Sequence, residues 1–118
     1  ITYFIRNEFC YKIIEDKIYS ELTKLNFNFA HIGTKYLIEA IILIYFNNTN
    51  NFILSKEVYP IIAKKYNTNI NTVKCDILHA IINSYYECEE DFLASYFRIF
   101  PLTKPKTKYV IYTILSKL

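Results

Sequence analysis

The sequence has 118 residues, of which 53% are hydrophobic, and a formal net charge of +3. A chain of this length and apolar content can bury one hydrophobic core, so we expect a single compact domain. One glycine and three prolines are too few for the tight turns of a many-stranded sheet, while the apolar residues recur at helical spacing. The composition favours an all-α fold, and the elements described below add up to about six helices. The small positive charge permits a polyanionic partner without requiring one.

The three cysteines, Cys10, Cys75 and Cys88, form no CxxC pair and accompany no secretory leader. This pattern is typical of a reducing compartment, so we expect a cytoplasmic protein. The most apolar run, residues 36–46, contains a glutamate and is too short to span a bilayer of about 30 Å. We therefore expect a buried helix there and no membrane partner. The chain starts at Ile1 and not at a methionine, so an upstream domain stays open.

The first third of the chain predicts two helices. Residues 1–9 alternate β-branched and aromatic side chains, which fits either a strand end or the lead into a helix. Residues 11–25 keep a three- to four-residue apolar spacing and predict an amphipathic helix. Gly33 is expected to accept backbone angles that other residues resist, with a helix beginning after this break. That helix, residues 34–46, is apolar on nearly every side and should lie at the centre of the domain.

Residues 57–86 predict two further helices joined by a polar turn. Pro60 suits the first turn of a helix, where its missing N–H has no partner in any case, and Ser55 is expected to cap that helix. Asn67 tolerates the left-handed conformation and Asn69 is a favourable N-cap, so the second helix should begin near Ile70. This is the pattern of a helix-turn-helix, although plain helical hairpins share it.

The second of these helices has two different sides at about 100° per residue. We expect one side to face the core and the other to face a partner. The inward set is Ile70, Val73, Ile77, Ala80 and Ser84, and the outward set is Asn71, Thr72, Cys75, Leu78, His79 and Ile82.

The last third of the chain predicts two more helices around a basic connector. Four acidic residues between Glu87 and Asp91 suit the first turn of one helix, which Pro101 is expected to end. The basic residues 103–108 lead into a last amphipathic helix over residues 109–118. Lysines here and at the end of the first hairpin helix are candidates for phosphate contacts, although a solvated lysine face explains them equally well. The phosphate candidates are Lys64, Lys65, Thr68, Lys104, Lys106 and Lys108.

Several motifs resemble one known family. The most specific are YPIIAKKYNT over residues 59–68 and VxxxIxHAI over residues 73–81, joined by His31-Ile32-Gly33, Glu39-Ala40-Ile41 and Lys104-Pro105. Residues 22–118 resemble the C-terminal effector domain of the sporulation initiation response regulator, the stage zero sporulation protein A family. The resemblance implies a six-helix domain that binds double-stranded DNA through residues 69–86, and a last helix available for a homodimer on tandem sites. Residues 1–21 then form an N-terminal segment and the start of the first helix. The alternative is that they are the end of an upstream domain.

The same comparison shows a departure on the outward side. In that family, arginines and a glutamate read bases, whereas the corresponding positions here hold Thr72, Lys74, Cys75 and Leu78. Arginine reads guanine through two hydrogen bonds, worth about 1 to 3 kcal/mol of discrimination, and neither cysteine nor leucine replaces it. We therefore expect an altered base specificity. The expected base-facing residues are Asn71, Thr72, Lys74, Cys75, Leu78 and His79.

Two functions follow from this departure. In a DNA-binding transcription regulator, Asn71 or Lys74 makes polar base contacts while Leu78 and Ile82 touch thymine methyl groups. In a degenerate relative, the exposed Leu78 and Ile82 instead bind a protein, such as another regulator, without sequence-specific DNA binding.

Other chemistry has weaker support in the sequence. Cys75 and His79 share a helix face and would hold a metal only with a third ligand such as Cys88 or Glu87, and ligand spacing is otherwise absent. The sequence has no glycine-rich phosphate loop, no plausible Ser/His/Asp arrangement and no paired acids in an apolar pocket. We expect no metal, no cofactor, no small-molecule substrate and no enzyme activity.

Overall fold

The computed structural model describes residues 2–47, 51–98 and 106–118, with side chains from Phe9 onward. In these ranges it contains six α-helices, one π-helical turn and no β-strand, so the predicted all-α fold is confirmed. None of the helices in these ranges is long and apolar enough to cross a membrane. The elements are α1 (Thr2–Lys24), α2 (Ile32–Asn47), η1 (Leu54–Val58), α3 (Tyr59–Lys65), α4 (Ile70–Glu87), α5 (Glu90–Phe97) and α6 (Thr107–Ser116).

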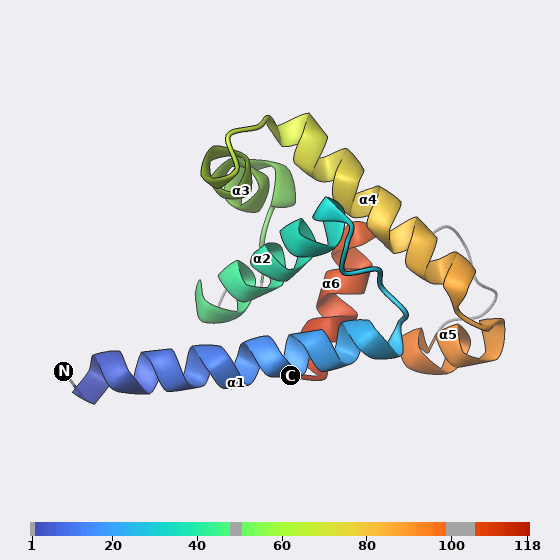
Figure 1. The fold of residues 1–118 in the computed structure, drawn as a ribbon, viewed down its shortest axis with the longest axis horizontal. Coiled ribbons are helices and arrows are strands. Elements are labelled where there is room, and N and C mark those ends of the chain that lie inside the picture. Colours follow the sequence, from blue (N-terminus) through green and yellow to red (C-terminus); the bar gives the residue numbers. More distant parts are fainter. Residues whose placement is uncertain (1, 48–50, 99–105) are drawn as a thin grey trace.

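Helix α2 lies at the centre of the molecule (Figure 1) and contacts α1, η1, α3, α4 and α6. Its Leu37, Ala40 and Ile41 are fully buried, as the apolar run predicts. Helix α1 runs along one long side of the domain, α4 covers the opposite side, and α5 lies near the C-terminal end of α4 (Figure 1). The core therefore sits between α1 and the pair formed by α3 and α4.

Gly33 has a role that the sequence did not indicate. Helix α2 begins at Ile32, so Gly33 lies in the first turn of the helix, and its φ is not positive. A Cβ atom at this position would lie 1.9 Å from the backbone oxygen of Asp76 in α4. The missing side chain thus lets α2 and α4 approach closely. The expectation of a helix break at Gly33 is wrong, because the constraint comes from packing and not from the backbone angles.

Two asparagines end helices in the left-handed conformation that is usually taken by glycine. Asn26 (φ 58°) follows α1, and Asn67 (φ 54°) follows α3, as predicted. After Asn67, the backbone N–H of Thr68 donates to the oxygen of Ala63 at 2.8 Å, and an equivalent bond follows Asn26. These are Schellman motifs, which satisfy the last free carbonyl groups of a helix. They explain how a chain with a single glycine makes tight helix ends.

The observed ends of α1, α3 and α5 agree only in part with the ends predicted from the sequence. The first residues extend α1, so the lead into a helix is confirmed over the strand end, and α1 crosses residue 21 without a break. Ser55 lies inside η1 and caps no helix, because η1 starts from Ile53 and α3 from Val58. Helix α5 carries Glu90 and Asp91 in its first turn, as predicted. It ends before a left-handed residue at position 98, while Pro101 lies outside the described residues.

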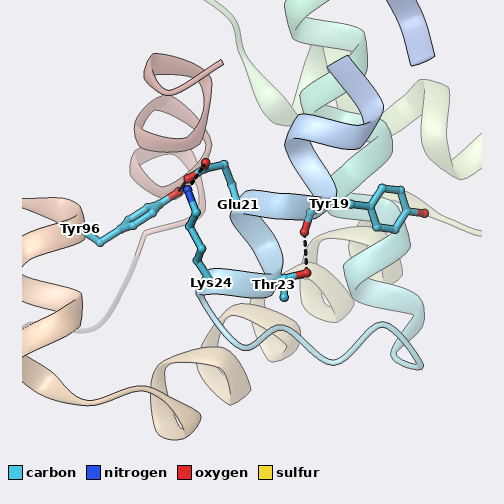
Figure 2. A network of polar contacts seen from close by, with 5 residues as sticks. All are labelled: Tyr19, Glu21, Thr23, Lys24 and Tyr96. Carbon is cyan, nitrogen blue, oxygen red and sulfur yellow. Dashed lines mark hydrogen bonds and ion pairs between the residues drawn. The ribbon is translucent and has the colours of Figure 1, made fainter. Parts of the chain in front are cut away.

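A buried polar network attaches α5 to α1 (Figure 2). Tyr96 Oη donates to Glu21 Oε1 at 2.8 Å, and Lys24 Nζ donates to Glu21 Oε2 at 2.9 Å. Burial alone raises the pKa of Glu21, but the hydrogen bonds from Lys24 and Tyr96 outweigh it, so the pKa lies below its ordinary value. Lys117 Nζ lies 4.4 Å from the centroid of the Tyr96 ring. The network thus joins α1, α5 and the residue after α6.

Candidate nucleic-acid interface

Helices α3 and α4 contact each other and form the predicted helix-turn-helix. Pro60 lies in the first turn of α3, and Ile62 and Ala63 are buried. At the start of α4, Asn69 Oδ1 accepts a hydrogen bond from the backbone N–H of Thr72 at 2.8 Å. The predicted N-cap is therefore confirmed, and it fixes where the second helix begins.

The inward side of α4 is tightly held by the rest of the domain. Val73 and Ile77 are fully buried, and Ala80 and Ser84 are buried with them. Ser84 Oγ donates to the backbone oxygen of Leu25 at 2.6 Å, in the turn after α1. These contacts, together with the close approach at Gly33, set both the position and the rotation of α4.

The outward side of α4 is open along its first three turns. Asn71, Cys75 and His79 are exposed, and Thr72 is half-buried. Ile70 differs from its predicted inward place, because its side chain is 40% exposed. The core-facing stripe starts one turn later, at Val73, and the first residue of α4 stands at the edge of the domain.

A shallow apolar hollow of about 520 Å³ borders this side of α4. Leu78 and Lys74 line it from α4, so Leu78 is half-buried and Lys74 points toward the same region as the start of α6. Tyr59 and Thr107 also line the hollow. Burial raises the pKa of Tyr59 to about 12, against the opposing effect of its hydrogen bond with Thr107. The remaining lining residues are Ile53, Leu54, Ser55, Lys106 and Lys108.

The predicted phosphate-binding lysines are not equivalent. Lys64 is exposed, whereas Lys65 Nζ donates to Glu39 Oε1 at 2.8 Å, which raises the pKa of Lys65. Lys106 is exposed at the N-cap of α6, and Lys108 Nζ lies 5.2 Å from the centroid of the Phe52 ring. Thr68 is half-buried in the turn, and Lys104 lies outside the described residues.

Cys75 and Cys88 lie in different places and do not form a metal site with their neighbours. Cys75 Sγ lies 4.0 Å from Asn71 Oδ1, one turn earlier on α4. Cys88 follows the C-terminal end of α4, where its Sγ donates to the backbone oxygen of Leu25 at 3.0 Å. In the part of the chain that the structure describes, no three His, Cys, Asp or Glu residues are placed to hold a metal ion.

The family model described as "Sporulation initiation factor Spo0A C terminal" matches residues 18–118. The chain belongs to this family. Domains of the Spo0A C-terminal family are DNA-binding parts of transcription regulators of sporulation, so the resemblance inferred from the sequence is confirmed. The match begins inside α1 and includes α2 to α6.

In this Spo0A C-terminal domain, α4 is the second helix of the helix-turn-helix, and its outward side carries few charged residues. This α4 contains one lysine and no arginine. Among the residues expected to face bases, Asn71, Lys74, Cys75 and His79 are exposed, whereas Thr72 and Leu78 are half-buried. The outward surface of this family member is therefore mostly uncharged.

Sequence reasoning missed two features of this surface. Ile70 was assigned to the core because its spacing fits the inward stripe, and position at the helix end was the available signal against it. Glu39 was not connected to Lys65, since the two lie 26 residues apart and no local pattern joins them. The pair of Lys65 and Glu39 depends on the packing of α3 against α2, and the exposure of Ile70 depends on where the core ends along α4.

Proposed function

We propose that this Spo0A C-terminal domain binds duplex DNA with the outward side of α4 in the major groove, and with a base specificity that differs from that of its family. The single observation that carries the proposal is the contrast between the two sides of α4. Val73 and Ile77 are fully buried, whereas Asn71, Cys75 and His79 are exposed on a helix whose position the core fixes. A recognition helix must be held firmly by the core on one side and expose side chains to the bases on the other.

The altered specificity follows from the chemistry of the exposed residues. Asparagine can form two hydrogen bonds with adenine, and apolar groups can contact the methyl group of thymine, whereas guanine is most often read by arginine or lysine. Because α4 has no arginine, the two hydrogen bonds that an arginine guanidinium makes with guanine have no equivalent here, and Lys74 is the one lysine on the helix. We therefore expect an operator that differs from that of the arginine-bearing members.

Phosphate contacts in this proposal come from both sides of the reading helix. Lys64 lies in the last turn of α3, while Lys106 and Lys108 lie at the start of α6 beside the hollow next to α4. Each neutralised phosphate contributes about 0.9 to the slope of log affinity against log salt concentration. We expect Lys65 to contribute less than Lys64, because Glu39 already neutralises part of its charge.

A protein-binding module is the second candidate function. The apolar hollow beside Leu78 favours it, because Ile53, Leu54 and Tyr59 line the same region. Against it, Leu78 and Ile82 are both half-buried, so they offer a smaller apolar surface than full exposure would give. We therefore rank DNA binding first.

The proposal includes a homodimer on tandem sites through α6. Helix α6 buries Val110, Ile111 and Ile114 in the core, and it exposes Tyr109 by 39% on its other side. A side chain of this kind gives a large contact area at little cost in conformational entropy. The dimer predicts cooperative binding to a duplex with two sites and independent binding to separate sites.

Selection from a pool of random duplexes tests the proposal and separates the two functions. We expect enrichment of one motif, followed by a mobility shift of that motif that weakens as salt rises. A Lys64→Ala variant should weaken binding to all duplexes alike. Binding without any enriched motif, or no binding at all, would contradict the proposal and favour the protein-binding module.

A further inference from the structure

We infer that the first turn of α4 selects adenine–thymine base pairs, with Asn71 reading adenine and Ile70 contacting a thymine methyl group. The inference rests on the DNA binding proposed above and adds which base pairs are read. Both residues stand at the N-terminal end of α4, the part of a recognition helix that reaches base edges. Their side chains leave the core, unlike those of Val73 and Ile77.

Ile70 is an apolar residue, and its side chain is exposed at the end of α4 that we propose to lie in the major groove. Its exposed fraction is 40%, although the same helix buries Val73 and Ile77 completely. Among the base edges of the major groove, the thymine methyl group is the apolar one. The sequence had instead suggested Leu78 and Ile82 for this contact, but both are half-buried, and Leu78 lies beside Ile53 and Leu54. The structure therefore moves the expected thymine contact from Leu78 to the first residue of the helix.

Asn71 carries the amide that matches adenine. Its side chain is exposed, whereas the neighbouring Asn69 uses its oxygen to cap the helix. Adenine offers N7 as an acceptor and N6 as a donor, so an amide can bind both atoms at once. Cys75 Sγ donates to Asn71 Oδ1 at 4.0 Å, a weak contact that leaves the second lone pair of the oxygen for N6 and the amide nitrogen for N7.

The charged residues of α4 do not provide a competing guanine reader in this turn. Lys74 is the only basic side chain that α4 contains, apart from a histidine at position 79. Lys74 lines the hollow with Lys106 and Lys108, on the flank where we expect a phosphate strand. The exposed groups of the first turn are thus the sec-butyl side chain of Ile70 and the amide of Asn71, a pair that suits thymine and adenine.

Base analogues test each contact atom by atom in the motif enriched by selection. Uracil in place of thymine removes only the methyl group, and 7-deazaadenine in place of adenine removes only the N7 acceptor. We expect each analogue, at one position of the motif, to weaken wild-type binding by about fivefold, close to the lower limit for loss of a specific base contact. Ile70→Ala should become insensitive to uracil at that position while remaining sensitive to 7-deazaadenine. Asn71→Ala should show the opposite pattern.

Two controls keep the outcomes distinct. Asn83→Ala changes a half-buried asparagine three turns further along α4 and should leave both sensitivities intact. Asn71→Gln retains an amide and should restore part of the adenine preference. A motif with a guanine–cytosine core, or analogue effects that are equal in wild type and variants, would overturn the inference while leaving DNA binding in place. Failure to enrich any motif would instead reject the proposed function, and this inference with it.

Discussion

The two sides of α4 differ in their contacts: the inward side packs against the rest of the domain, and the outward side faces solvent. The inward side is held at three places, by close approach to Gly33, by burial of Ile77 and by the hydrogen bond from Ser84 to the turn after α1. The outward side presents Cys75 and His79 to solvent. Substitutions on the first side should therefore change stability, and substitutions on the second should change binding.

The proposed change of DNA target is compatible with an unchanged fold because of this contrast. The core demands particular volumes, because buried side chains pack at close to crystalline density. The exposed positions carry no such demand, so positions such as those of Asn71 and Cys75 can vary at little cost in folding free energy. The expected effects below run from the largest to the smallest.

Gly33→Ala should give the largest loss of stability. The new Cβ would meet the backbone oxygen of Asp76 at 1.9 Å, so α2 and α4 must move apart. We expect a loss of about 3 kcal/mol in the free energy of unfolding, measured by urea titration. Ser20→Ala, at an exposed position of α1, should change it by less than about 0.5 kcal/mol. A Gly33→Ala domain as stable as wild type would show that the close approach is not required.

Tyr96→Phe should cost about 2 kcal/mol, because it removes one hydrogen bond from the buried carboxylate of Glu21. The pKa of Glu21 is lowered in the folded state, so its ionised form contributes stability above the ordinary pKa of 4.5. That contribution is lost as the pH falls through the lower folded pKa. The difference between wild type and variant should therefore be full at pH 7 and shrink in acid.

The matched control for this variant is Tyr86→Phe, which removes a hydroxyl from a residue that is 84% exposed. Thermal unfolding at pH 7 and at about pH 3 should show no pH-dependent difference for it. If Tyr96→Phe likewise showed the same loss at both pH values, the charge of Glu21 would not be the source of the effect.

Asn69→Ala should have an intermediate effect that reaches both sides of α4. Loss of the cap to the Thr72 N–H should cost about 1 kcal/mol and loosen the first turn, where the DNA contacts are proposed. Asn69→Asp keeps the acceptor oxygen and should retain the stability. Circular dichroism during thermal unfolding checks both variants, and equal melting temperatures for Asn69→Ala and wild type would reject the cap.

His79→Ala should have the smallest effect on stability, within about 0.5 kcal/mol, because the side chain is exposed. If the outward side reads DNA, the same substitution should weaken binding to the selected motif in a mobility shift. Loss of stability comparable to that of Tyr96→Phe would show that His79 serves the fold.

Local chemistry made much of this structure predictable. Pro60, Asn67 and Asn69 each act through bonds to residues within a few positions, so their roles could be inferred from the sequence. Gly33 and Glu39 act on α4 and α3, which lie far away along the chain. Their partners emerge only when the helices pack, which is why the sequence predicted a helix break at Gly33 and no pairing between Lys65 and Glu39.

The candidate site shows the same division. Helical spacing placed Cys75 and His79 outward correctly, because burial follows the periodicity in the middle of a helix. At Ile70 the periodicity failed, since the core does not extend to the first residue of α4. Leu78 lies beside residues of η1 and α6, which no spacing rule connects to α4.

The most direct test of the outward side of α4 is the effect of a carboxylate placed at its centre. Cys75→Glu puts a negative charge on this side, and Ser20→Glu makes the same change in charge at an exposed position of α1. Fluorescence anisotropy with the selected duplex should show at least a tenfold loss of affinity for Cys75→Glu and little change for Ser20→Glu, since phosphates repel the added charge. Equal affinities for the two folded variants would contradict the claim that this side of α4 binds DNA.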